Sequence, residues 1–322
     1  MKYKVVFVIL GIGLFLFLIK QDYLNQYFYY KKLPQKVDNN IYDRDIPDTI
    51  PLNKLRFLST HNSYHKQAGH LKLMIAKLFA PNEVEGLKYS HPHLYQQLDS
   101  GVRSMEFDVR YVNGSFVNMH VPIVDNSSNS PDVALAFKEI NKWSNNHPLH
   151  IPIIIMVELS REWCEYYLFQ SKWNENLFLK FDDVVFNEFK NKVITPTDLE
   201  KGYPNLKDVR GKIAVVFMAD SDIVGLFGEK YSKNRKATHI MVDCKYPDKS
   251  KALFVKRDNP YASDIDSLVK SGFIVRTRID TELVKDQKKK NRALNSLSQI
   301  VSTDFPKTIN EYKQYLKNDF IQ

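Results

Sequence analysis

The chain has 322 residues, of which 43% are hydrophobic and 13% aromatic. This composition can build a large buried core, and it excludes disordered and collagen-like chains. The formal net charge is +9, but the basic residues are scattered and show no helix-turn-helix, RNA-binding or zinc-finger spacing. We therefore expect no nucleic-acid partner, and attraction to an anionic lipid surface would account for the same charge. Nothing in the sequence indicates an obligate protein partner.

Residues 1–20 have the pattern of a signal peptide or signal anchor. Lys2 and Lys4 precede an apolar run from Val5 to Ile19, which ends at Lys20. A membrane-spanning helix needs about 20 apolar residues, so the run is short, yet no small-residue cleavage site follows it. We predict an exported protein, either secreted or membrane-anchored through this amino-terminal hydrophobic helix, and we favour the uncleaved anchor.

Residues 21–52 are aromatic and polar, are interrupted by prolines, and show no sustained periodicity. This composition predicts a linker, so we assign residues 53–322 to the folded domain. Cys164 and Cys244 are the only cysteines. They are too few for a disulfide framework, and one bridge and two free thiols are both open.

The domain contains eight short apolar runs that are typical of buried parallel strands. They are Leu55–Thr60, Ser104–Val109, Phe116–His120, Ile153–Glu158, Ile213–Met218, His239–Asp243, Phe273–Arg278 and Gln299–Thr303. Mostly helical stretches separate them, which favours a closed (β/α)8 TIM barrel, an α/β fold, over an open sheet. In such a barrel the catalytic residues lie where the strands end.

The stretch after the first strand contains an amphipathic helix. Its apolar residues recur at spacings of three and four, and Lys72 and Lys77 flank them. These apolar residues are Leu71, Met74, Ile75, Leu78 and Phe79. Two interpretations are open: the apolar face packs on the barrel, or the helix lies on the rim and enters lipid.

Acidic residues end two of the predicted strands. Glu106 and Asp108 are two apart, so both side chains point to the same face, and Glu158 ends another predicted strand. Together with the Asn62 amide they form a hard, all-oxygen ligand set, which suits Ca2+ best and Mg2+ second, whereas zinc is disfavoured. If only the segment around Glu106 and Asp108 is considered, a structural salt bridge of these two carboxylates with Arg103 or Arg110 is equally open.

Two histidines also follow predicted strands, His61 and His120. Beside a metal site, a pair of imidazoles can remove a proton from a nucleophile and deliver one to a leaving oxygen. This combination points to metal-assisted phosphodiester cleavage. We interpret the other seven histidines, His65 among them, as structural or surface residues.

The ordered motifs of the chain resemble one known family. They are His61-Asn62-Ser63-Tyr64, Tyr89-Ser90-His91-Pro92, Gln97-Leu98-Asp99-Ser100-Gly101-Val102-Arg103, Glu106-Phe107-Asp108-Val109, His120, and the later segments around Phe254, Arg276 and Thr303. From about residue 53 to 310 this series is similar to the calcium-dependent, bacterial-type phosphoinositide phospholipase C-like phosphodiesterases. The resemblance implies the phospholipase C barrel.

The resemblance also implies roles for the matching residues. His61 and His120 would be catalytic, Glu106 would double as a general base, and Asn62, Glu106, Asp108 and Glu158 would bind calcium. Arg276 and Arg278 alternate on one strand, so we predict that both contact the phosphate or inositol of the substrate. A salt-bridged layer of the two arginines with Asp280 or Glu282 is the alternative. Asp304, just beyond the last predicted strand, is a weaker candidate for a substrate contact.

The expected reaction is the calcium-dependent cleavage of phosphatidylinositol-type phospholipids at a membrane surface, to diacylglycerol and a cyclic or acyclic inositol phosphate. A glycerophosphodiester phosphodiesterase ranks second, because the His-Arg-Gly start of that family is replaced by His61-Asn62-Ser63. A catalytically silent lipid-binding barrel is a further alternative. A nuclease would need a basic groove, which the scattered lysines do not support.

Overall fold

The computed structural model describes residues 20–35, 43, 45–79, 81, 84–122, 124–159, 170–219, 224–281 and 283–305. Most of the predicted signal segment, residues 1–19, lies outside this part of the chain. Cys164 lies outside it as well, so both alternatives for the two cysteines stay untested. Within the described ranges, no helix combines the length and the apolar character needed to cross a membrane.

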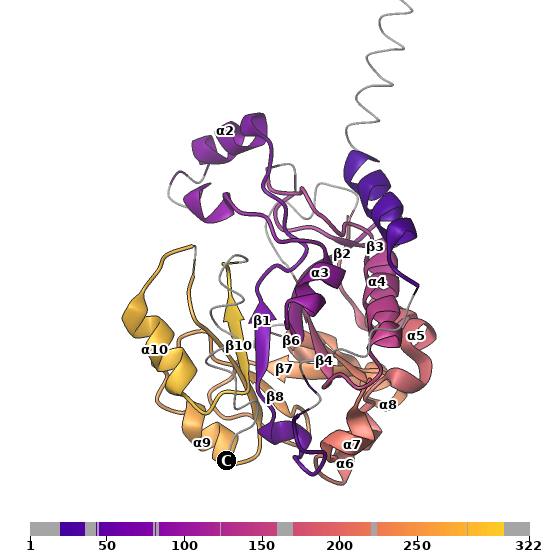
Figure 1. The fold of residues 1–322 in the computed structure, drawn as a ribbon, viewed down its shortest axis with the longest axis vertical. Coiled ribbons are helices and arrows are strands. Elements are labelled where there is room, and N and C mark those ends of the chain that lie inside the picture. Colours follow the sequence, from indigo (N-terminus) through magenta and orange to yellow (C-terminus); the bar gives the residue numbers. More distant parts are fainter. Residues whose placement is uncertain are drawn as a thin grey trace, which may run out of the picture.

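Eight parallel strands close into a barrel (Figure 1). They are β1 (Phe57–Thr60), β2 (Ser104–Val112), β4 (Ile153–Glu158), β6 (Ile213–Ala219), β7 (Thr238–Val242), β8 (Phe254–Lys256), β9 (Ile274–Arg278) and β10 (Ile300–Thr303). The order around the barrel is β1-β10-β9-β8-β7-β6-β4-β2, and β2 pairs with β1 to complete the ring. The predicted (β/α)8 TIM barrel is confirmed.

Seven of the eight predicted runs are barrel strands, but Phe116–His120 is not. It contains most of β3 (Ser115–Asn118), which pairs antiparallel with the outer half of β2 as a hairpin. The turn is Asn113-Gly114, and both residues have positive φ, 49° and 86°. A two-residue turn of this kind matches the twist of a hairpin, so the chain folds back here.

β8 takes the eighth place in the barrel. Its three residues were too few for a strand to be recognised from the sequence. The short strand β5 (Gln170–Ser171) extends the hairpin.

The side chains inside the barrel change character along the strands. Near the strand starts they are apolar, such as Ile154 and Met156 on β4 and Ile274 on β9, which belong to one buried cluster. Two residues further along the same faces stand Glu158 and Arg276. The barrel is therefore filled by apolar residues at its base and opens into a charged mouth at the C-terminal ends of the strands.

Helices cover the outside of the barrel. They are α3 (Leu94–Asp99), α4 (Val133–Asn146), α5 (Glu175–Phe189), α6 (Pro196–Glu200), α7 (Leu206–Val209), α8 (Gly228–Asn234), α9 (Ile265–Lys270) and α10 (Gln287–Asn295), with 3-10 turns at Leu52–Lys54, Val84–Leu87, Lys190–Lys192 and Val224–Leu226. Side-chain caps fix where the longer helices begin. Asp132 accepts a hydrogen bond from the Leu135 N–H at the start of α4, and Asn174 accepts one from Leu177 at the start of α5.

Residues 20–32 are helical, so the predicted linker is wrong for this part of the chain. The buried side chain of Gln26 exchanges two hydrogen bonds of 2.9 Å with the backbone of Asp132. Tyr29 stacks on His93 with 3.6 Å between ring centroids, and Leu33 joins the main apolar cluster. The helix is stabilised by docking on the barrel rather than by its own periodicity, which explains why the sequence did not show it.

The predicted amphipathic helix is α2 (His70–Phe79), which lies beyond the C-terminal ends of the strands (Figure 1). Leu71, Met74 and Leu78 are 70%, 55% and 80% exposed. These three residues therefore do not pack on the barrel, which contradicts the first interpretation of this helix. Ala76 of the same helix is buried, so α2 exposes Leu71, Met74 and Leu78 while part of it stays packed on the molecule.

Candidate active site

Three carboxylates converge at the mouth of the barrel. Glu106 and Asp108 point inward from β2, and Glu158 ends the neighbouring β4, opposite Asp108 in the strand register. One carboxylate oxygen from each lies within 4.8 Å of the others. Asn62 follows β1 and is buried with a φ of 46°, a left-handed conformation that asparagine tolerates better than most residues.

Burial and mutual repulsion make it harder for the carboxylates of this cluster to ionise. Burial, with the charge of Glu158, raises the pKa of Asp108 to about 7, and burial also raises the pKa of Glu106 well above its usual range. Within the described structure, Asn62 Oδ1 and Asp108 Oδ1 are buried without a hydrogen-bond donor. Such oxygens are costly unless a cation binds them. The donor set thus fits Ca2+, which Asn62, Glu106, Asp108 and Glu158 would hold.

Arg276 contacts the cluster from the opposite side of the barrel. Its guanidinium lies 2.6 Å from Glu106 Oε2 and also bonds Asp258. Although burial would lower the pKa of Arg276, Asp258 and Glu106 raise it above its ordinary value. The partner of Glu106 is therefore Arg276 rather than Arg103, which bonds Asp43 at 2.7 Å.

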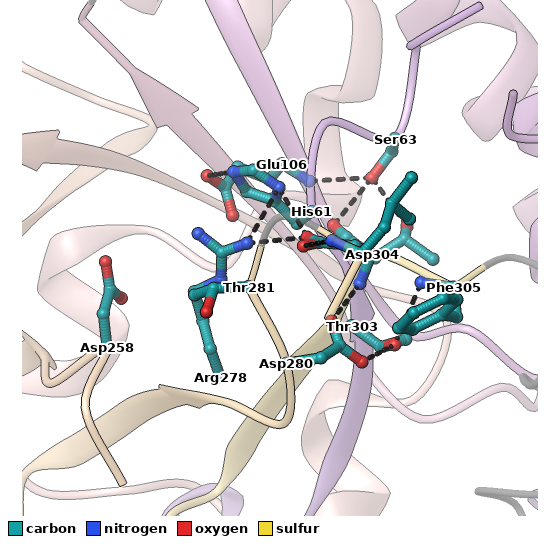
Figure 2. Close-up of polar contacts among 12 residues, drawn as sticks. His61, Ser63, Glu106, Asp258, Arg278, Asp280, Thr281, Thr303, Asp304 and Phe305 are labelled. Carbon is teal, nitrogen blue, oxygen red and sulfur yellow. Dashed lines mark hydrogen bonds and ion pairs between the residues drawn. The ribbon is translucent and has the colours of Figure 1, made fainter. Parts of the chain in front are cut away.

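His61 stands between Glu106 and Asp304 (Figure 2). Its Nδ1 donates to Asp304 Oδ1 at 2.8 Å, and its Nε2 is 3.6 Å from Glu106 Oε1. Arg278 bonds the same oxygen of Asp304 at 2.7 Å. Burial and the charge of Arg278 lower the pKa of His61 to about 4 against the opposing effect of Asp304, so the imidazole is neutral at physiological pH.

His120 follows the β2–β3 hairpin and turns back toward the barrel mouth. Its Nδ1 donates to Asp125 Oδ2 at 2.8 Å. Arg110 of β2 donates to the carbonyls of Met119 and His120, which fixes the backbone of this turn. Burial would raise the pKa of Asp125, but the hydrogen bonds from His120 and His65 lower it to about 2.

The structure brings the predicted site residues to one end of the barrel. The two arginines are held by Glu106, Asp258 and Asp304 rather than by the partners named in the alternative. Asp280 instead bonds Thr303 and the Asp304 N–H, both at 2.6 Å, and Glu282 lies outside the described residues.

Sequence reasoning missed the carboxylate of Asp125 and the proximity of His65 to it, 3.0 Å. It ranked Asp304 as no more than a weak candidate. Asp304 could have been found from its place directly after β10. Asp125 lies in a loop without periodicity, and no sequence signal marked it.

Comparison with known proteins identifies the family and the fold. The sequence matches the family described as phosphoinositide phospholipase C, Ca2+-dependent, over residues 50–116 and 111–319. No curated protein sequence matches significantly.

Among solved structures, a calcium-dependent phosphoinositol-specific phospholipase C from Pseudomonas sp. is 17% identical with a TM-score of 0.57, covering 86% of this chain and 96% of that chain. The Ca2+-dependent phosphatidylinositol-specific enzyme from Streptomyces antibioticus is 14% identical with a TM-score of 0.56, covering 81% and 96%. The phosphatidylinositol-specific enzyme from Listeria monocytogenes is 18% identical with a TM-score of 0.51, covering 85% and 96%.

At these identities the structural likeness establishes the barrel fold, while the family match spans most of the sequence and establishes the class. The chain belongs to the Ca2+-dependent phosphoinositide phospholipase C family and is a phosphoric diester hydrolase of that class.

Proposed function

We propose that the protein cleaves phosphatidylinositol-type phospholipids on the glycerol side of the phosphate, releasing diacylglycerol and an inositol phosphate. One observation carries the proposal: two imidazoles, each bonded to its own carboxylate, lie at the same barrel mouth as the oxygen cluster of Glu106, Asp108 and Glu158. This combination of proton acceptor, proton donor and hard-cation site suits metal-assisted phosphodiester cleavage.

We assign proton removal to His61 and proton delivery to His120. The lowered pKa of His61 keeps it neutral, and Asp304 stabilises the imidazolium that forms when it accepts the proton of the attacking hydroxyl. Glu106 is the weaker candidate for this base, because it already bonds Arg276 and belongs to the metal-ligand set. His120 then protonates the leaving diacylglycerol oxygen.

Asn62, Glu106, Asp108 and Glu158 would hold the calcium ion. When bound, the ion supplies positive charge against the phosphate oxygens and lowers the pKa of the attacking hydroxyl. Arg278, whose side chain is 13% exposed, is better placed to reach the substrate phosphate than Arg276, which is 1% exposed. Arg276 would act mainly by orienting Glu106.

The enzyme would bind its substrate at a membrane surface. Leu71, Met74 and Leu78 project from α2 at the end where the site opens, and Lys72 and Lys77 beside them suit anionic head groups. The helical residues 20–32 expose further aromatic side chains, such as Phe28, at 57%. With the signal pattern of residues 1–20, these features support an exported enzyme that is anchored to, or acts on, a lipid bilayer.

The test is a panel of phospholipids incubated with the full-length protein, with Ca2+ or with a chelator, followed by identification of the water-soluble product. We expect inositol phosphate release only from phosphatidylinositol-type lipids and only with Ca2+. Release of glycerophosphodiester cleavage products instead, or binding to vesicles without any turnover, would contradict the proposal.

A matched pair of variants checks the site assignment. H120A should lose nearly all turnover, because the leaving oxygen then has no proton donor. H239Q removes a different buried imidazole, which bonds the Ile194 carbonyl and belongs to β7 near its start, and it should keep turnover. Turnover by H120A equal to that of H239Q would refute the role of His120.

A further inference from the structure

Asp125 is shared by two histidines. Its Oδ2 accepts a hydrogen bond of 2.8 Å from His120 Nδ1, and both of its oxygens lie 3.0 Å from His65 Nε2. Asp125 and His65 are completely buried, whereas the His120 side chain is 29% exposed. The shared carboxylate therefore connects an interior imidazole with the one at the barrel mouth.

The hydrogen bonds of His65 determine where its hydrogens lie. Its Nδ1 is 3.0 Å from the Tyr89 carbonyl oxygen, which can only accept, so Nδ1 carries a hydrogen. A second hydrogen must then lie between Nε2 and the carboxylate of Asp125, which makes that contact a charge-assisted hydrogen bond. The ring also stacks on Tyr89 with 4.2 Å between centroids, so its plane is fixed.

We propose that His65 is a positioning residue for His120, an inference that rests on the proposed function for its effect on turnover. His65 immobilises Asp125, and the immobilised carboxylate accepts the Nδ1–H of His120. This arrangement keeps one hydrogen on Nδ1 of His120 and leaves Nε2 to face the substrate. The imidazolium form of His120 can then deliver its Nε2 hydrogen to the leaving oxygen, after which the ring remains as the Nδ1–H tautomer. An Asp125 bonded to His120 alone would be free to rotate, and the tautomer would no longer be fixed.

A purely structural explanation does not account for the arrangement. Burying an ion pair is costly, and well-packed apolar residues in its place are often as stable or more stable. His65 and Asp125 are joined across 60 residues of sequence and lie in different loops, yet their bond orients a third residue at the mouth of the site. The pair is therefore better explained by what it does to His120.

The experiment compares H65Q with H239Q and H120A in the full-length protein. Glutamine at position 65 can donate to Asp125 or occupy the space beside Tyr89, but it cannot donate to both. We expect kcat on a soluble phosphoinositide to fall about 10- to 100-fold in H65Q, with KM changed by less than about twofold. At a pH where His120 is neutral, the 15N spectrum of histidine-labelled protein should show this residue as a mixture of tautomers in H65Q and as the Nδ1–H form in H239Q.

The possible outcomes distinguish a failure of the positioning role of His65 from a failure of the proposed function. If H65Q keeps both kcat and the Nδ1–H tautomer while H120A is inactive, the positioning role is wrong and the proposed function stands. If the wild-type protein shows no turnover of the phosphoinositide, the proposed function fails; if H120A keeps turnover, only the catalytic role of His120 fails. In both cases the tautomer spectrum alone decides on positioning. Should H65Q not fold, the wild-type spectrum decides: hydrogens on both nitrogens of His65 and on Nδ1 of His120 support the proposal, and any other pattern overturns it.

Discussion

At the scale of single residues, the two histidines of the site have matching environments. Each donates from Nδ1 to a carboxylate at 2.8 Å. His61 bonds Asp304, which follows β10, and His120 bonds Asp125, five residues further along the chain. In the proposed mechanism both rings therefore use the opposite nitrogen, Nε2, to exchange a proton with the substrate. The environments differ in charge, since Arg278 also bonds Asp304 whereas a second histidine bonds Asp125.

The first prediction concerns the carboxylate behind His61. D304N should lower kcat by about 10²- to 10⁴-fold with little effect on KM, because the amide cannot stabilise the imidazolium and allows the wrong tautomer. Steady-state kinetics on a soluble phosphoinositide measure this effect. D248N, which removes an aspartate charge from an exposed turn, is the control. Equal kcat values for the two variants would rule out the assigned role of Asp304.

The second prediction separates the two properties of Asn62, its amide oxygen and its positive φ. N62G and N62A both remove the oxygen, so Ca2+ affinity measured by calorimetry should fall about tenfold or more in each. N62A should in addition lose about 1 kcal/mol of unfolding free energy without calcium, because alanine adopts this left-handed φ less readily than asparagine or glycine. Unchanged Ca2+ affinity in N62G would mean that the amide is not a ligand.

The sequence revealed those site residues that directly follow strands, and missed those set by loop contacts. Glu106, Asp108 and Glu158 were predictable because strand alternation fixes the direction of their side chains. Asp125 was not, because its contact with His65 depends on how two irregular loops meet, and no periodic pattern encodes that. Arg278 was correctly placed at the site, but its bond to Asp304 was not foreseen.

At the scale of elements, α2 differs from the other helices because it leaves large apolar side chains exposed. Leu78 is 80% exposed on the side of the molecule where the site opens, while the helices along the barrel wall bury their apolar faces. Helix α4, for example, buries Phe137, Ile140 and Trp143. An exposed apolar helix beside a charged mouth is typical of an element that enters a lipid interface.

The third prediction tests this element. L78E should weaken binding to anionic vesicles by about tenfold or more, because a buried leucine contributes about 1.5–3 kcal/mol when it leaves water. Hydrolysis of a soluble phosphoinositide should stay unchanged. L149E alters a leucine that is 42% exposed just before β4, at the other end of the barrel, and should leave vesicle binding intact. Equal vesicle binding by both variants would exclude α2 from the interface.

Element predictions failed where tertiary contacts outweighed local pattern. The second strand of the β2–β3 hairpin, Phe116–His120, was predicted as a barrel strand, although Asn113-Gly114 is a strong turn signal that would have corrected it. The helix of residues 20–32 had no such signal, because docking contacts such as that of Gln26 with Asp132 stabilise it. The barrel itself was predictable because its central strands, such as β4, are continuous apolar runs.

At the scale of the whole molecule, the site makes stability depend on both pH and calcium. In the calcium-free protein the pKa of Asp108 is about 7 against an ordinary 3.8, so the folded state binds this proton more tightly than the unfolded chain. The contribution of Asp108 to stability is full below pH 3.8 and is lost as the pH rises toward 7. Glu106 shifts in the same direction.

The fourth prediction follows from the raised pKa values of Asp108 and Glu106. Ca2+ binds the ionised carboxylates, so the increase in Tm on adding Ca2+ should be small near pH 5.5 and should grow through pH 7 to 8. Thermal unfolding with Ca2+ and with a chelator across this range measures it, and D108N should flatten the pH dependence. A Ca2+ effect that is larger at pH 5.5 than at pH 8 would contradict the ligand assignment.

The bond between Arg276 and Glu106 has a consequence for ion sensitivity. The guanidinium is a permanent cation 2.6 Å from one of the ligand oxygens, so any divalent ion must share that carboxylate and overcome the repulsion between like charges. Arg276 thereby lowers the affinity of the carboxylate cluster for Ca2+. An enzyme tuned in this way would remain idle at the trace calcium levels of a cytosol and become active in calcium-rich fluids outside the cell.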